Sequence, residues 1–253
     1  MRNLGTAIET EARKASASRV VPWTTGILIG GLAALTLGLL AAAAAGDERV
    51  IARLGPLAEL DGWPLLVGTA AQILAAGGLG ACGVLVSWLF GREFTEGTVS
   101  GLYALPVRRS TIAIGKLIVY LTWAMIVALT VTLVLGILGA AAGMLSTDAD
   151  RIGELARIPL LMALTALIAV PAAWVASLAR SILAGIAATI VLMIVAQVSA
   201  ILGVGAWVPL VAPALWAIAP SSVPAGALIG VLSIPAVFCA ATAYVWARLQ
   251  LDR

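Results

Sequence analysis

The side chains that could carry chemistry are few, and their types argue against the common enzymatic sites. The sequence contains no histidine, and its two cysteines, Cys82 and Cys239, stand inside apolar runs where a thiol packs as a small hydrophobic group. Zinc or haem sites built from the usual ligands are therefore not expected, and no Cys-x-x-Cys pair is present. The apolar runs also lack paired carboxylates and serine–histidine pairs, so we expect no catalytic residue, cofactor site or metal site in this chain.

A nucleotide site is also missing from the sequence. Gly115 and Lys116 resemble the end of a phosphate-binding loop, but Leu117 follows where Ser or Thr is required. Ser110 occupies the position of the first glycine of that motif. Any ATP that drives this protein must therefore be hydrolysed by a separate chain.

Ion-coupled transport needs ionisable side chains in mid-membrane, where they bind and release the driving ion. The apolar runs contain none, and Gln72 and Gln197 are their only side-chain amides. Neither amide titrates, and we expect each to form an interhelical hydrogen bond rather than to contact a substrate. This argues against a proton- or sodium-driven carrier but leaves a passive channel open.

Residues 92–116 form the one long charged passage between the apolar runs. Apolar side chains recur at helical spacing through its first half, charged residues stand at its start, and Pro106 ends the pattern. Such a helix could lay its apolar face into a groove on a cytoplasmic partner, or it could merely connect two membrane spans, and the pattern alone does not decide. The apolar positions are Phe94, Val99, Leu102 and Tyr103, and the charged positions are Arg92, Glu93 and Glu96.

The composition of the chain shows which environment and which kind of secondary structure surround these residues. Of the 253 residues, 62% are apolar and 11% are charged, and the mean hydropathy is +1.11. A chain of this composition lies in a bilayer, and its long continuous apolar runs indicate helices rather than barrel strands. The net charge of +3 comes from basic residues scattered at helix ends rather than clustered with aromatic residues, so no nucleic-acid partner is expected.

We therefore predict an all-α integral membrane protein, with a single transmembrane domain over residues 1–253. An amphipathic helix on the membrane surface is predicted for residues 3–19, a tight turn at Arg180, and bends at Pro171 and Pro235. Short interrupted helices that dip into the outer membrane face are predicted for residues 205–224. The six predicted spans are residues 20–45, 63–90, 117–142, 158–178, 182–204 and 225–246.

The distribution of basic residues predicts the orientation of these spans. If both termini are cytoplasmic, four basic residues fall in outer loops and eleven of the fifteen fall inside, as the positive-inside rule requires. We therefore predict a multi-pass protein of the cell membrane with both termini in the cytoplasm. The inner basic residues are Arg2, Arg13, Lys14, Arg19, Arg92, Arg108, Arg109, Lys116, Arg180, Arg248 and Arg253, and the outer ones are Arg49, Arg53, Arg151 and Arg157.

The charged passage, taken with this topology, resembles the cytoplasmic signature of the ABC-2 type transporter permeases. The motifs that carry the resemblance are Arg92-Glu93-Phe94, Glu96-Gly97-Thr98, Leu105-Pro106-Val107 with Arg108 and Arg109, and Gly115-Lys116. The resemblance implies a surface helix before the first span, a coupling helix over residues 92–105 and re-entrant outer helices between spans five and six.

The same resemblance implies the partners and the contact residues. These partners are two copies of a nucleotide-binding subunit, which bind ATP and Mg, and a second permease chain, identical or related. Glu93 and Glu96 are the expected polar contacts to the ATPase, Phe94 is its expected buried anchor, and Arg180 makes a smaller second contact. The full expected coupling set is Arg92, Glu93, Phe94, Glu96, Gly97, Thr98, Leu102, Tyr103, Pro106 and Arg108.

The predicted function is that of a permease subunit, not itself an enzyme, in an ATP-driven exporter of a hydrophobic or amphiphilic compound such as a drug, a peptide antibiotic or a lipid. One alternative is the membrane subunit of an ABC-type assembly or maturation factor. A channel or carrier that works without ATP is a further alternative.

Overall fold

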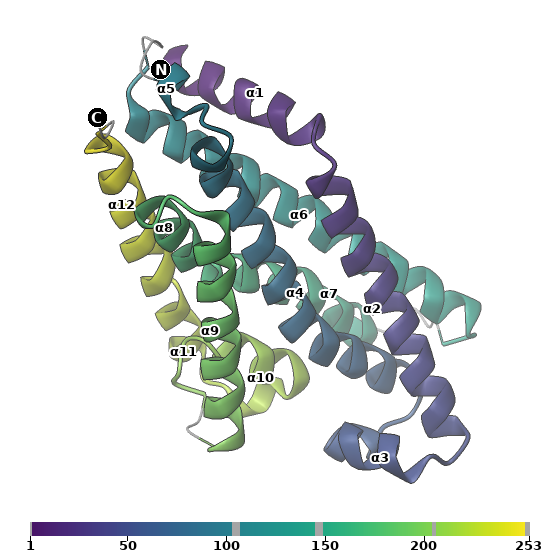
Figure 1. The fold of residues 1–253 in the computed structure, drawn as a ribbon. Helices are drawn as coiled ribbons and strands as arrows, with labels where there is room; N and C mark the ends of the chain where they lie inside the picture. The colour runs from purple at the N-terminus through teal and green to yellow at the C-terminus, as the bar shows by residue number, and fades with distance from the viewer. Residues whose placement is uncertain (1, 103–106, 145–148, 204–205, 251–253) are drawn as a thin grey trace.

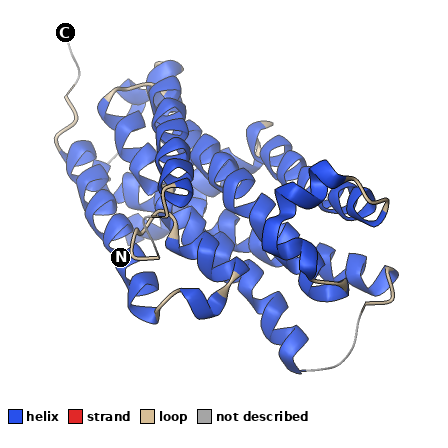
Figure 2. Cartoon of the chain, turned by 90° about the horizontal axis from the view of Figure 1, so that it is seen from below, coloured by secondary structure: helices blue, strands red, loops and turns tan. Residues whose placement is uncertain are grey.

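The computed structural model of the chain describes residues 2–102, 107–144, 149–203 and 206–250. Within these ranges the chain forms helices joined by loops, with no strand (Figure 2). Six helical segments are long and apolar enough to cross a membrane. The all-helical class and the number of six spans are therefore confirmed. The segments are Val20–Ala44, Gly62–Thr95, Arg109–Ala141, Ile152–Leu178, Ile182–Ile201 and Ala225–Ala247.

The first half of the chain contains α1 (Arg2–Ser16), α2 (Val20–Ala44), α3 (Glu48–Leu54), η1 (Gly55–Glu59), α4 (Gly62–Thr95), α5 (Val99–Leu102) and α6 (Arg109–Ala141). The second half contains α7 (Ala149–Ile168), α8 (Val170–Leu178), α9 (Ile182–Ile201), α10 (Ala212–Ile218), η2 (Pro220–Ser222), α11 (Ala225–Val231) and α12 (Ser233–Ala247).

The helix α4 packs against α2, α6, α7, α8 and α9, so it forms the centre of the bundle. Both chain ends and α5 lie at one end of the bundle, and α3 and α10 lie at the other (Figure 1). Large apolar side chains such as Ile126, Leu129 and Leu133 of α6 are exposed, as expected for a surface that meets lipid rather than water. The two ends of the bundle present different elements, because the chain ends and α5 lie at one end and α3 and α10 lie at the other.

Small residues let α9 approach α4 closely. A Cβ atom added to Gly91 would lie 2.7 Å from the backbone nitrogen of Ile182, and one added to Gly185 would lie 2.5 Å from the Ser87 hydroxyl oxygen. Gly83 faces Thr189 in the same way. Small residues at these positions therefore allow the two helices to pack at close range.

The predicted interruptions of the helices occur close to the expected residues. The helical path breaks at Ala169, and Pro171 stands in the first turn of α8. A second break at Leu232 precedes Pro235, which lies in the first turn of α12. Arg180, with φ of 52°, takes the left-handed conformation in the turn between α8 and α9. Glycine usually occupies this conformation at the end of a helix, but here Arg180 adopts it. For this reason no glycine or proline marks the turn in the sequence.

The described residues do not form the single helix that was predicted for residues 92–105. The membrane helix α4 continues through Thr95, and Gly97, with φ of 69°, ends it in the left-handed conformation that glycine adopts without strain. Only the short α5 (Val99–Leu102) follows, and residues 103–106 lie outside the described ranges. The third membrane helix, α6, also begins earlier than predicted, at Arg109 rather than at Leu117.

Candidate functional site

Five charged side chains from three helices meet at the end of the bundle that carries the chain termini. Glu11 and Lys14 come from α1, Arg92 and Glu93 from α4, and Lys116 from α6. We call these five residues the charged cluster. Three cations and two anions give it a net charge of +1, so most of its charge is compensated internally.

Lys116 lies at the centre of this cluster. Its side chain has no exposed surface, and its Nζ atom donates hydrogen bonds to Glu11 Oε2 at 2.7 Å and to Glu93 Oε1 at 2.9 Å. Burying an ammonium group costs several kcal/mol unless carboxylates replace its lost hydration. The two carboxylates, which are themselves 2% and 3% exposed, supply that compensation.

Lys14 and Arg92 complete the charge balance around the two carboxylates. Lys14 Nζ donates to Glu11 Oε1 at 2.9 Å and to Glu93 Oε1 at 3.0 Å. Burial lowers the pKa of Lys14, but its hydrogen bonds to Glu11 and Glu93 outweigh that effect and raise the pKa above its ordinary value. The Arg92 guanidinium lies 3.6 Å from Glu11 Oε2 and stacks 4.5 Å over the Trp88 ring.

A hydrogen bond joins the cluster to the loop that follows α4. The Thr98 hydroxyl donates to Glu93 Oε2 at 2.7 Å, so both oxygens of that carboxylate are used. Glu96, Gly97 and Thr98 form an exposed turn, which we call the 96–98 turn. The turn is therefore attached to the cluster through Glu93.

Aromatic side chains pack beside the cluster around the buried Trp246 of α12. Phe90 meets its ring edge-on at a centroid distance of 5.8 Å, and Phe94 does so at 6.1 Å. The Lys116 Nζ atom lies 5.6 Å from the centroid of the same ring, and the indole N–H donates to the Ser177 hydroxyl at 2.9 Å. The charged end of the bundle therefore has a packed interior that involves α4, α6, α8 and α12.

The residues that the sequence analysis assigns to a partner ATPase fall into a buried group and an exposed group. Arg92 and Glu93 are buried within the chain, and Phe94 is half-buried against Trp246, so we no longer expect these three to face a partner. The exposed members are Glu96, Gly97, Thr98 and Arg108. Tyr103, Pro106 and the side chain of Leu102 lie outside what the structure describes.

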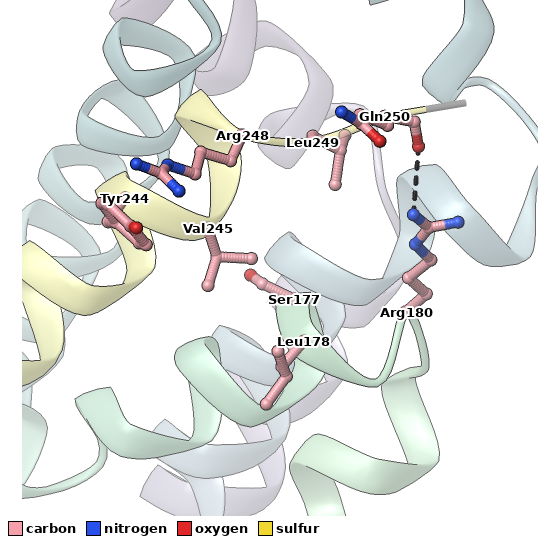
Figure 3. Close-up of a pocket in the computed structure, with 8 residues that line it drawn as sticks. All are labelled: Ser177, Leu178, Arg180, Tyr244, Val245, Arg248, Leu249 and Gln250. Carbon is pink, nitrogen blue, oxygen red and sulfur yellow. Dashed lines mark hydrogen bonds between the residues drawn. The ribbon is translucent and has the colours of Figure 1, made fainter. Parts of the chain in front are cut away.

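The predicted second contact, Arg180, is also exposed and lies beside the end of the chain. Its Nη2 atom donates to the Gln250 carbonyl oxygen at 3.0 Å (Figure 3). Arg109, the first residue of α6, donates to the neighbouring carbonyl of Leu249. A pocket of about 300 Å³ separates Arg180 from Tyr244 and Arg248, whose guanidinium stacks on the Tyr244 ring at 4.6 Å. The turn at Arg180 therefore holds the C-terminal segment in place.

A larger cavity of about 510 Å³ lies between α4, α9 and α10. Its lining is apolar except for Gln72 and Gln197, the two amides expected to make interhelical hydrogen bonds. The structure instead brings both amides to one space, where both side chains are exposed. No charged residue lines it among the described residues, so the cavity suits an uncharged or weakly polar compound.

Sequence reasoning missed the charged cluster, although two residues signalled it. Glu11 falls on the apolar face of the predicted first helix, and Lys116 stands at the edge of a long apolar run. An isolated charge in either place is costly, which indicates a buried partner. The partner could not be identified because Glu11 and Lys116 are 105 residues apart in sequence.

Comparisons with known proteins agree with the resemblance found in the sequence. The sequence model of the family described as ABC-2 family transporter protein matches residues 7–196, which include all five residues of the charged cluster. A curated relative, the bacitracin transport permease protein BCRB of Bacillus licheniformis, is 37% identical over 67 residues. That match covers 25% of this chain and 32% of the relative, so the chain spans about a third of the relative's length.

Proposed function

Because the chain belongs to the ABC-2 family of transporter proteins, we propose that it is the membrane-spanning permease subunit of an exporter powered by a separate ABC ATPase. In this role the chain binds no nucleotide itself. Two nucleotide-binding subunits hold ATP and Mg, and a second permease chain, identical or related, completes the transport path. The apolar side chains exposed on α9 offer one surface for that second chain.

The observation that carries this proposal is the 96–98 turn. It is exposed, it bears the carboxylate of Glu96, and it is attached to the charged cluster through the bond from Thr98 to Glu93. A partner that pulls on such a turn moves the end of the central helix α4 rather than a loose loop. The turn, together with Arg108 and Arg180, is the surface that we assign to the ATPase.

The orientation required by this assignment follows from charge. The end of the bundle with both termini and α5 (Figure 1) carries the three cations of the charged cluster, and Arg109 and Arg180 bond the C-terminal segment there. Positively charged loops favour the cytoplasmic side of a cell membrane. We therefore place this end in the cytoplasm, with α1 along the membrane surface and α10 dipping into the outer face.

The cavity between α4, α9 and α10 supports an amphiphilic cargo. Its apolar walls favour a hydrophobic body, and its two amides can bond to carbonyl, amide or hydroxyl groups. The relative that matches part of this chain is named for bacitracin transport. We therefore propose a peptide antibiotic or a similar amphiphile as the exported compound.

Co-purification with the ATPase tests the contact surface. The variant Glu96→Lys reverses the charge of the turn and should weaken ATPase binding at least about tenfold, because a like charge then meets the partner surface. The matched control Glu48→Lys makes the same change at an exposed residue of α3, at the other end of the bundle, and should leave binding unchanged. Equal binding by both variants would remove the 96–98 turn from the contact surface.

Transport is tested in inside-out vesicles that contain the permease and its ATPase. ATP-dependent uptake of fluorescently labelled bacitracin supports export of an amphiphile. Stable association with an ATPase but no uptake of bacitracin or other amphiphiles would favour an assembly factor instead.

A further inference from the structure

The charged cluster joins elements that the chain itself connects only through long segments. Lys116 bonds α1 through Glu11 and α4 through Glu93, while Thr98 attaches the 96–98 turn to the same Glu93 carboxylate. A displacement of the turn therefore reaches α6 through Glu93 and Lys116, and it reaches α1 from Glu93 through Lys14 or through Lys116 and Glu11. The alternative route along the backbone passes through residues 99–109 and does not reach α1.

The buried apolar side chains of α1 are small. Ala7 and Ala15 are buried side chains of α1, and Gly115 of α6 packs against the backbone of Ala7. Methyl groups and a glycine bury little apolar surface, so they contribute little attraction. The contact nevertheless keeps the two helices close, because a Cβ atom at Gly115 would lie 3.3 Å from the Ala7 Cβ.

We propose that Lys116, with Glu11 and Glu93, is a positioning joint that makes α1, the end of α4 and the start of α6 move as one body when the ATPase pulls on the 96–98 turn. This inference rests on the proposed function, because it assumes that the force arrives at that turn. It adds that α1 is a driven part of the transporter and not only a surface anchor.

The test uses a variant that removes one charge of each sign. Glu11→Gln with Lys116→Met keeps the net charge and similar side-chain volumes, while Glu93 retains Lys14 and Arg92 as partners. Spin labels at Ala12 of α1 and Ile114 of α6, both exposed, report the distance between the two helices whose direct ion pair is removed, in the complete permease–ATPase complex. The matched control, Glu9→Gln with Arg13→Gln, removes an exposed ion pair from the same helix.

In the unaltered protein and in the control, we expect one narrow distance that ATP and Mg do not change. In the Glu11→Gln/Lys116→Met variant, we expect the same distance without nucleotide, and a shifted or broadened distribution when ATP is added. A distribution that stays narrow and unchanged under ATP would overturn the inference. One that is already broad without nucleotide would also overturn it, because the cluster would then be a static packing feature.

An engineered disulfide between α1 and α6 tests whether a covalent bond can replace the lost ion pair. Ala7→Cys with Gly115→Cys places two sulfur-bearing side chains near the Cβ separation of a disulfide, once the helices yield by a few tenths of an ångström. Oxidation of this pair in the Glu11→Gln/Lys116→Met variant should restore the narrow distance under ATP, and reduction should abolish that rescue. If the unaltered protein does not retain the ATPase in the same sample, the proposed function fails, and the inference fails with it.

Discussion

Lys116 shows how a single residue can be misread from sequence and still indicate the site. Its position at the edge of an apolar run suggested the boundary of a membrane span, whereas the structure buries it fully and places it inside α6. The apparent boundary reflects the cost of an unpaired charge in lipid, and two carboxylates offset that cost here.

The first prediction concerns the stability that this lysine contributes. Lys116→Met removes two charge-assisted hydrogen bonds and leaves Glu11 and Glu93 with Lys14 and Arg92 as their cations, and we expect a loss of about 1–3 kcal/mol, measured by thermal or denaturant unfolding in detergent. The Glu11→Gln/Lys116→Met double variant should lose less than Lys116→Met alone, because only one buried carboxylate, that of Glu93, then remains to be paired with Lys14 and Arg92. A single variant as stable as the unaltered protein would contradict the described ion pairs.

The second prediction concerns the two amides of the large cavity. Gln72→Leu and Gln197→Leu should each weaken ATP-dependent bacitracin uptake by about threefold to tenfold, the loss expected for one hydrogen bond. ATPase association should persist, because both residues are remote from the 96–98 turn. Gln250→Leu makes the same change outside the cavity and should transport normally. Normal transport by both cavity variants would exclude these amides from cargo binding.

At the residue scale, sequence reasoning identified the correct region but assigned some side chains to the wrong surroundings. Glu93 and Phe94 were expected to face a partner because the family resemblance implies a coupling helix there, whereas their pattern alone fits either a partner-binding helix or a connector. Glu93 instead bonds Lys116 and Lys14, and Phe94 packs on Trp246. The periodicity of one segment shows which side chains share a face, but it does not show whether that face meets another chain or this one.

At the scale of elements, the predicted spans agree closely with the helices where composition changes abruptly. The first span, predicted over residues 20–45, is α2 over Val20–Ala44. The agreement fails where charges are compensated internally, so α4 and α6 both extend beyond their predicted ends. The end of α4 was marked by Gly97, a helix-terminating glycine that the helical pattern of residues 92–105 had hidden.

The third prediction tests the close contact of α4 with α9. A methyl group at Gly91 would meet the backbone of Ile182, at 2.7 Å from its nitrogen and 2.8 Å from its Cα, and backbone atoms cannot rotate away. Gly91→Ala should therefore cost about 1–3 kcal/mol, seen as a lower melting temperature in detergent. Gly30→Ala in α2, where no atom lies within 4 Å, should be neutral or slightly stabilising. Equal melting temperatures for both variants would contradict the close contact.

At the scale of the whole molecule, the class of the fold and the number of spans followed from composition, because only helices suit long apolar runs in lipid. The way the helices pack did not follow, since the apolar faces of the six spans are nearly interchangeable in sequence. The cavity between α4, α9 and α10 illustrates this limit, because its lining comes from segments separated by more than a hundred residues.

The fourth prediction concerns the sidedness of the bundle. With Cys82 and Cys239 replaced, single cysteines at Glu48 and Glu96 should differ in their reaction with a membrane-impermeant maleimide. Glu48→Cys should react in intact cells, and Glu96→Cys should react only after permeabilisation, because the 96–98 turn is assigned to the cytoplasm. Labelling of Glu96→Cys in intact cells would reverse the proposed orientation.

The central claim is that an ATPase works on this protein through the 96–98 turn, and cross-linking in native membranes tests it most directly. A bifunctional reagent attached to Glu96→Cys should yield an adduct with the ABC ATPase, whereas the same reagent attached to Glu48→Cys should yield none. If the ATPase co-purifies with the protein but no adduct forms at Glu96→Cys, the force enters elsewhere and the account is wrong.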